Sequence, residues 1–168
     1  MIILGVDPGS LHTGFGVIEW RQGVARAVVS GRLSAPAELS MGERLVRLAE
    51  GLAELIARER PDLAAVEKPF HGVSARSAIV LSEARGALLV TIARAGLAIE
   101  EFSPAEVKSS ITGNGRADKE QVARMVRLQL RLASGRLTPD ASDALAVALC
   151  AAVRQPLARR VAAAEADK

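Results

Sequence analysis

The first third of the chain carries short apolar runs of the length that β-strands have. One run covers residues 2–7, and two longer ones, over 14–20 and 24–33, flank a turn at 21–23. Strand-length runs separated by a short glycine-containing turn are typical of neighbouring antiparallel strands. The pattern therefore predicts a three-stranded antiparallel meander at the start of the chain.

After residue 40, segments with helical spacing of apolar residues alternate with short buried runs. The predicted elements are a helix from Ser40 to Pro61, a strand over 63–67, a helix from Ser74 to Gly96, a strand over 97–102, helices that begin at Ser103 and Thr138, and a helix over 119–130. A loop is predicted at 113–115. Helical crossovers between strands give the first strand parallel neighbours. The order predicts an α/β fold with a mixed five-stranded sheet flanked by helices.

The length of 168 residues and a hydrophobic content of 49% suit one domain with a sizeable core. We expect this domain to cover residues 1–156. The pattern decays after Gln155-Pro156, and residues 157–168 form an alanine- and arginine-rich tail that is either a frayed helix or disordered. We expect no function from this tail.

Charge and cysteine content set limits on the partners and the compartment. The formal charge of +3 permits an anionic partner without requiring one. Cys150 is the single cysteine and follows an apolar run, so an intramolecular disulfide is excluded and a buried position is expected. The N-terminus shows no signal peptide and no segment is long enough to span a bilayer. We expect a soluble, cytoplasmic protein.

Four carboxylates fall where a predicted strand ends or a helix begins: Asp7, Glu67, Asp140 and Asp143. Sites in such sheets gather at the carboxyl ends of parallel strands, where Asp7 and Glu67 would meet. Carboxylate oxygens suit Mg²⁺, and two metal ions about 3.5 to 4 Å apart can activate water for in-line attack on phosphorus. The pattern predicts a divalent-metal site.

A structural interpretation of each acid stays open. An acid at a strand end is often a solvated boundary residue, and Asp140 alone would favour a helix N-terminus through the helix dipole. Asp143 weakens this interpretation because it lies further into the helix, beside Ala144-Leu145. The four acids together favour a site.

Other residues near these acids have two interpretations each. The glycine turn over 7–14 fits either a phosphate-binding loop or a tight connection. Phe70 would either stack on a base or fold onto the core. His12 and His71 are either polar loop residues or ligands. The basic residues Arg76, Arg85, Lys108, Arg116 and Lys119 would either hold phosphates or form a solvated face.

Taken in order, four motifs resemble the RuvC Holliday-junction resolvases. They are Asp7-Pro8-Gly9-Ser10 with Thr13-Gly14, Glu67 with Phe70, Ala84-Arg85-Gly86, and Asp140-Ala141-Ser142-Asp143-Ala144. The resemblance runs from Met1 to about Val153. It implies a ribonuclease H-like fold and a bacterial origin.

The resemblance also implies a homodimeric endonuclease that uses Mg²⁺ or Mn²⁺, two ions per site, to nick four-way junction DNA in recombination and repair. Asp7, Glu67, Asp140 and Asp143 match the metal-binding acids of the family. Lys108 and Lys119 match its basic residues near the scissile phosphate, and Phe70 matches an aromatic that contacts bases at the junction centre. RuvA and RuvB are the implied partners. We expect the helix from Ser74 to Ala95, through Leu88, to form the dimer interface.

Some positions depart from the family pattern: Leu11 and His12 occupy a stretch that is often more basic in the family, Phe15 stands where tyrosine is common, and Lys68 follows the second acid. These put loop-level DNA contacts in doubt rather than the reaction. Two rival functions remain. Actin-like kinases share the aspartate-glycine turn but need two such domains, and a non-catalytic nucleic-acid-binding module would not need four acids at one edge.

Overall fold

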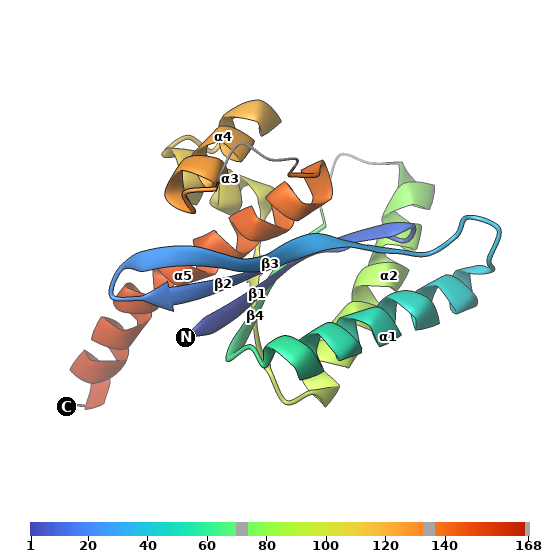
Figure 1. Cartoon of the computed structure of the whole chain (residues 1–168), viewed down its shortest axis with the longest axis horizontal. Coiled ribbons are helices and arrows are strands. Elements are labelled where there is room, and N and C mark those ends of the chain that lie inside the picture. The colour runs from blue at the N-terminus through green and yellow to red at the C-terminus, as the bar shows by residue number, and fades with distance from the viewer. Residues whose placement is uncertain (70–73, 133–136, 167–168) are drawn as a thin grey trace.

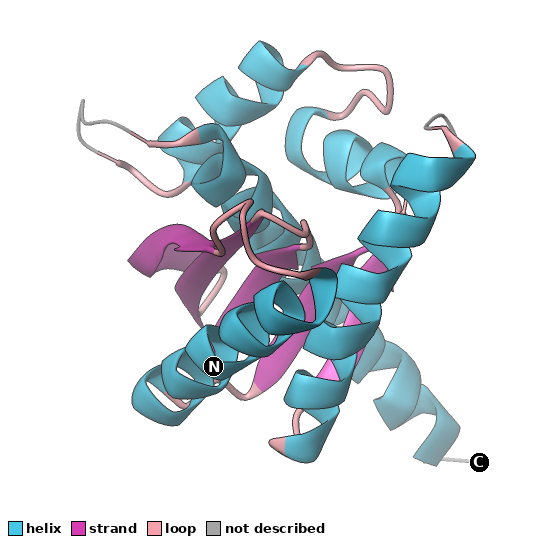
Figure 2. Cartoon of the chain, turned by 90° about the vertical axis from the view of Figure 1, so that its right-hand side faces the viewer, coloured by secondary structure: helices cyan, strands magenta, loops and turns pink. Residues whose placement is uncertain are grey.

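A five-stranded sheet lies between two layers of helices in the computed structural model, which describes residues 1–69, 74–132 and 137–166, with side chains as far as Gln155 (Figures 1 and 2). The strands are β1 (Ile2–Asp7), β2 (His12–Arg21), β3 (Val24–Ser34), β4 (Leu63–Glu67) and β5 (Ala98–Phe102). The helices are α1 (Met41–Glu59), α2 (Ala75–Arg94), α3 (Pro104–Thr112), α4 (Lys119–Gln129) and α5 (Pro139–Ala166). These elements match the predicted order.

The strand order in the sheet is β3-β2-β1-β4-β5. β1, β2 and β3 pair antiparallel, as the predicted meander requires, whereas β4 is parallel to both β1 and β5. The β2–β3 turn has positive φ angles of 52° at Gln22 and 81° at Gly23, which suit a tight hairpin connection. The predicted mixed five-stranded sheet is confirmed, and β1 lies at its centre with a parallel neighbour on one side.

Each face of the sheet has its own hydrophobic core (Figure 1). Leu4, Val6 and Ala64 face α1 and α2, where they meet Leu52 and Ile92. The opposite face packs against α3, α4 and α5, and Cys150 is buried there as expected. Because α5 crosses β1 and β2 on this face, the first turns of α5 lie beside the end of β1.

Glycines on β1 and β2 allow α5 to approach the sheet backbone. A Cβ atom on Gly5 would lie 2.0 Å from the carbonyl oxygen of Ala144, and one on Gly14 would lie 2.2 Å from the carbonyl oxygen of Asp140. Real Cβ atoms do not approach an oxygen so closely. The two glycines therefore fix how near the acidic end of α5 comes to the sheet.

Local capping signals define the helix starts. Ser40 with Glu43 and Ser103 with Glu106 form the predicted capping boxes, and Ser74 caps α2. The backbone of α5 continues as a helix to Ala166. The division between a domain over 1–156 and a tail over 157–168 stays a prediction. Among the described residues, the helices include none that is long and apolar enough to cross a membrane.

The choice of Leu88 as an interface residue was wrong. Leu88 is 1% exposed and packs inward in the core between α2 and the sheet. The sequence pattern marked Leu88 as apolar without showing which side of the helix the sheet would cover. The outward apolar residues of α2 are Ile79 and Val90, which are 61% and 58% exposed.

Candidate active site

Asp7 and Glu67 lie side by side because they end two neighbouring parallel strands. The register pairs Val6 with Val66, so the next residue on each strand is one of the two acids. Their carboxyl groups share a hydrogen bond. Burial raises the pKa of Asp7 to about 6 and that of Glu67 to about 8, and the negative charges of Asp143 and Asp7, respectively, contribute further. Both acids are therefore withdrawn from solvent and lie close to further negative charge.

Asp140 and Asp143 come to the same edge from α5. They are separated by one helical turn in its N-terminal part, and both raise the pKa of Asp7 through their charges. Gly14, the register partner of Asp7 on β2, contacts the Asp140 backbone. The close packing of α5 on Gly14 thus brings four acids, which are distant in sequence, to one sheet edge.

A basic residue lies near each of Asp140 and Asp143. The Nζ atom of Lys119, the first residue of α4, donates a hydrogen bond to Oδ2 of Asp143 at 3.2 Å. The Nη1 atom of Arg32 on β3 lies 3.6 Å from Oδ2 of Asp140. The charge of Asp143 raises the pKa of Lys119. These contacts compensate part of the negative charge of the site.

The four acids fit a hard divalent cation by their chemistry, because all offer oxygen donors. In the described part of the chain, however, no group of three or more His, Cys, Asp or Glu side chains lies close enough together to hold a metal ion. The contacts account for this: Asp143 is bonded to Lys119, Asp140 faces Arg32, and Asp7 is bonded to Glu67. Metal ligation would require the acids to exchange these partners.

A cavity of about 490 Å³ opens beside the acids, between the end of β4 and helices α3, α4 and α5. Glu67 and Asp143 line it together with Lys108 and Lys119. Its remaining lining is apolar. The structure therefore brings both predicted lysines to the same cavity as two of the predicted acids.

Comparisons with known proteins identify the family. The family model described as "Crossover junction endodeoxyribonuclease RuvC" matches residues 3–151. The chain belongs to the RuvC family. A RuvC from Anaeromyxobacter dehalogenans is 48% identical over 158 residues, which cover 94% of this chain and 84% of the relative. A RuvC from Chloroflexus aurantiacus is 42% identical over 160 residues, which cover 95% and 98%.

Solved structures agree with this family. The Thermus thermophilus RuvC in complex with Holliday junction substrate matches with a TM-score of 0.87 and 33% identity, over 94% of this chain and 96% of that one. The yeast mitochondrial resolvase Ydc2 matches with a TM-score of 0.66 at 11% identity, a likeness of fold alone. The predicted ribonuclease H-like fold is confirmed.

The glycine turn of this RuvC chain connects β1 to β2 tightly. The hydroxyl group of the fully buried Thr13 donates a hydrogen bond to the carbonyl oxygen of Gly9 at 2.9 Å. A Cβ atom on Gly9 would lie 2.1 Å from the carbonyl oxygen of His12. These contacts support the tight-connection interpretation, and they fix the chain directly after Asp7. The exposed His12 bonds to Ser34 through Nδ1 at 3.1 Å.

The remaining predicted DNA-contacting residues are dispersed. Arg76 is exposed at the start of α2, and Arg116 is exposed in the loop between α3 and α4. Arg85 points inward and forms an ion pair with Glu101. Phe70 and His71 lie outside the described residues. The interpretation of these positions as DNA contacts stays a prediction.

Arg32 and Glu101, which pair with Asp140 and Arg85 respectively, were not among the residues predicted from the sequence. Both lie on strands in which charged residues occupy exposed or half-buried positions. Only the register of β3 beside Gly14 brings Arg32 to α5. The one signal in the sequence that could have indicated these two residues is a charged residue on a predicted edge strand.

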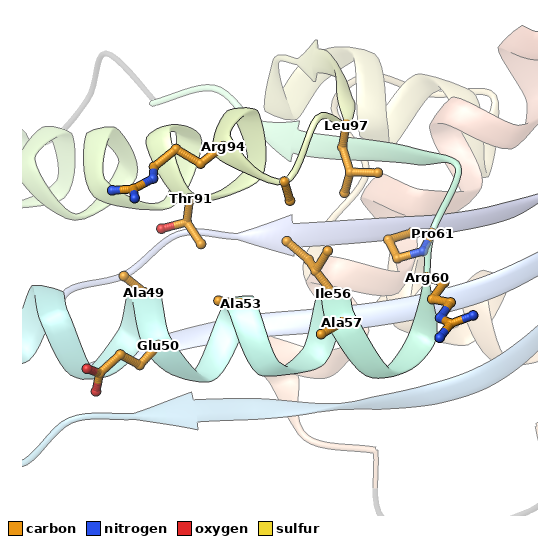
Figure 3. Close-up of a pocket in the computed structure, with 11 residues that line it drawn as sticks. Ala49, Glu50, Ala53, Ile56, Ala57, Arg60, Pro61, Thr91, Arg94 and Leu97 are labelled. Carbon is orange, nitrogen blue, oxygen red and sulfur yellow. The ribbon is translucent and has the colours of Figure 1, made fainter.

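A second cavity, of about 750 Å³, lies between α1 and α2 (Figure 3). Ala49, Ala53, Ile56 and Leu97 give it an apolar lining, and Arg94 lies near it on α2. It is on the face of the sheet opposite α5. Its lining offers one carboxylate, that of Glu50, so the edge with the four acids remains the candidate active site.

Proposed function

We propose that the chain is a crossover junction endodeoxyribonuclease that hydrolyses phosphodiester bonds in four-way DNA junctions during recombination and repair. The observation that carries this proposal is the meeting of Asp7, Glu67 and the two acids of α5 at one sheet edge, beside Lys108 and Lys119. RuvC relatives with this name and the junction complex of a RuvC at 33% identity support the substrate. A non-catalytic binding module would not require this concentration of acids.

Asp7, Glu67, Asp140 and Asp143 are the proposed ligands for two Mg²⁺ or Mn²⁺ ions per site. The family's nucleases are metal-dependent, and the all-oxygen donor set suits these metals. Bound there, the metal would supply an activated water and neutralise charge on the phosphate. Since a protonated carboxyl is a poor ligand, Asp7 and Glu67 must both lose their protons on loading, which makes metal affinity depend on pH.

Lys108 and Lys119 are proposed to act at the scissile phosphate. Both line the cavity that Glu67 and Asp143 share, so a phosphate there would lie within reach of two positive charges. Lys119 would exchange Asp143 for a phosphate oxygen as the acid takes up metal. Positive charge placed where negative charge develops lowers the barrier to phosphoryl transfer.

We also propose contacts to the rest of the junction. Arg76 and Arg116 are exposed and able to meet phosphates. For Phe70, the resemblance to the family supports base contact at the junction centre. RuvA and RuvB are the proposed partners on the same basis. A cytoplasmic location would bring the protein to bacterial DNA.

The proposed assembly is a homodimer, because a two-fold symmetric junction is matched by two identical sites. The outward face of α2 is the revised candidate interface. Ile79, Gly86 and Val90 recur there at helical spacing, and a Cβ atom on Gly86 would meet nothing within 4 Å. The exposed Glu83 lies on the same face, so the candidate interface combines apolar residues with one acid, and Gly86 leaves room for the helix of a second copy to approach closely.

The test of the activity compares labelled four-way junction, duplex and single-stranded DNA, each incubated with the protein and Mg²⁺ or Mn²⁺. We expect paired nicks in the junction and little cleavage of the other two DNAs. Omission of metal should stop cleavage. Binding to the junction without cleavage in either metal would favour the non-catalytic module, and ATP turnover would favour the kinase.

A further inference from the structure

Arg85 lies behind Glu67 and contacts two strands at the active-site edge. Its Nε atom donates a hydrogen bond to the backbone carbonyl oxygen of Glu67 at 3.3 Å. Its Nη2 atom forms an ion pair with Glu101 of β5. The Arg85 side chain is only 16% exposed, whereas that of Glu101 is 40% exposed. One guanidinium group therefore joins α2 to the ends of both β4 and β5.

The bonded carbonyl belongs to the last residue of β4. After Glu67 the chain leaves the sheet, and the amide of Lys68 donates the final backbone bond, to the carbonyl oxygen of Phe102 at 2.8 Å. Arg85 then provides a fixed donor for the carbonyl of Glu67 itself. A guanidinium group can serve two acceptors at once because its donors are held in a rigid plane.

The same contacts make Arg85 a poor anchor for phosphate. Its charge is already compensated by Glu101, and its side chain is largely buried. A small cavity of about 100 Å³, lined by Asp7, Glu67 and Arg85, places the guanidinium next to the acid pair rather than on an open basic surface. To contact DNA, Arg85 would need to give up both of its acceptors, the Glu67 carbonyl oxygen and the Glu101 carboxylate.

We propose that Arg85 is a positioning residue, which together with Glu101 holds the Glu67 backbone so that its carboxylate is correctly placed for catalysis. This inference rests on the proposed function, since it concerns the same site. It replaces the expectation that Arg85 binds DNA. Arg85 acts through Glu67 and does not touch the reacting atoms.

The test measures single-turnover cleavage, junction affinity over a range of salt, and the Mg²⁺ concentration for half-maximal rate. We expect Arg85→Gln to slow cleavage on the order of tenfold to a hundredfold, the effect of a small misplacement of a reacting group. It should also raise the half-saturating Mg²⁺ concentration, while junction affinity and its salt dependence stay unchanged. Arg85→Lys should rescue only part of the rate, because an ammonium group lacks the planar fork.

Glu101→Gln separates the two roles most sharply, because it frees the Arg85 charge without removing it. Positioning predicts slower cleavage and unchanged junction affinity. Phosphate anchoring predicts tighter junction binding with a steeper salt dependence. Arg94→Gln, which removes the same charge from the last turn of α2, is the matched control and should behave as wild type.

Melting temperatures of all variants show whether they are folded. If Arg85→Gln does not fold, Glu101→Gln still tests the inference, because it leaves the guanidinium group of Arg85 in place. Wild-type rates and Mg²⁺ dependence in both Arg85→Gln and Glu101→Gln would overturn the inference. So would a loss in Arg85→Gln that appears only as weaker, less salt-dependent junction binding. Failure of the wild type to cut junctions would instead refute the proposed function.

Discussion

Asp7 and Glu67 end adjacent parallel strands, so their carboxyl groups lie side by side at one edge of the sheet. Burial raises the pKa of both acids, to about 6 for Asp7 and to about 8 for Glu67. Asp143 adds further negative charge. Protonation of the pair is therefore favoured where the proposed chemistry needs two ionised acids.

This pair predicts that stability falls as pH rises. Between about pH 4 and pH 8 the folded state retains protons that the unfolded chain releases, so the free energy of unfolding decreases through this window. In EDTA at pH 8, Glu67→Gln should be more stable than wild type by on the order of 1 to 3 kcal/mol, and at pH 5 the gain should shrink. Urea unfolding at both pH values measures this difference.

Glu54→Gln, a change at an exposed position of α1, is the control and should leave stability unchanged at both pH values. Equal stability of wild type and Glu67→Gln at pH 8 would show that ionisation of the buried pair does not destabilise the fold.

Packing of α5 on the sheet predicts an effect of Gly14→Ala. The added methyl group would collide with the Asp140 backbone, so we expect a loss of about 1 to 3 kcal/mol in stability and slower cleavage through displacement of Asp140. Gly42→Ala is the control, because a Cβ atom there meets nothing within 4 Å. Urea unfolding and cleavage rates are the measurements; a Gly14→Ala protein as stable and active as wild type contradicts the role of this contact.

Much of this site could be predicted because its signals are local. Asp7 and Glu67 directly follow buried runs, and a parallel arrangement of the two strands suffices to bring them together. The helix starts are marked by capping residues such as Ser40 and Ser103. The strands, the helices and the edge that carries the acids therefore followed from the sequence.

Contacts between side chains of different elements were harder to predict from the sequence. Leu88 is buried because its side of α2 packs against the sheet. Apolar residues occur on several sides of α2, so the sequence does not show which side is buried. The pairing of Arg85 with Glu101 depends on the position of α2 over β5. Both are properties of packing, which the linear pattern does not encode.

Lys108→Ala and Lys119→Ala should each reduce the cleavage rate by about a hundredfold while junction affinity changes little, because their charges are placed at the reacting phosphate. Single-turnover rates and equilibrium binding, measured in parallel, separate the two effects. Arg124→Ala, an exposed change on α4, should alter neither. Equal losses in rate and affinity would identify the lysines as simple phosphate anchors.

The proposed dimer predicts that Val90→Glu yields monomers, because it replaces an exposed apolar residue of the outward face of α2 by a charge. Monomers should nick junctions singly rather than in pairs. Val46→Glu changes an equally exposed valine on α1 and should leave the dimer intact. Sedimentation velocity measures the assembly, and a monomeric wild type at micromolar concentration would contradict the proposal.

The most direct test of the central claim measures cleavage and binding of one labelled four-way junction. It compares wild type with Asp7→Asn, Glu67→Gln, Asp140→Asn and Asp143→Asn. Each substitution keeps the shape of the side chain and removes the charge that metal ligation needs, whereas phosphate contacts remain. We predict paired nicks by wild type in Mg²⁺, no cleavage by any variant, and junction binding by all five proteins. Full activity in any variant would contradict the role of that acid in the site.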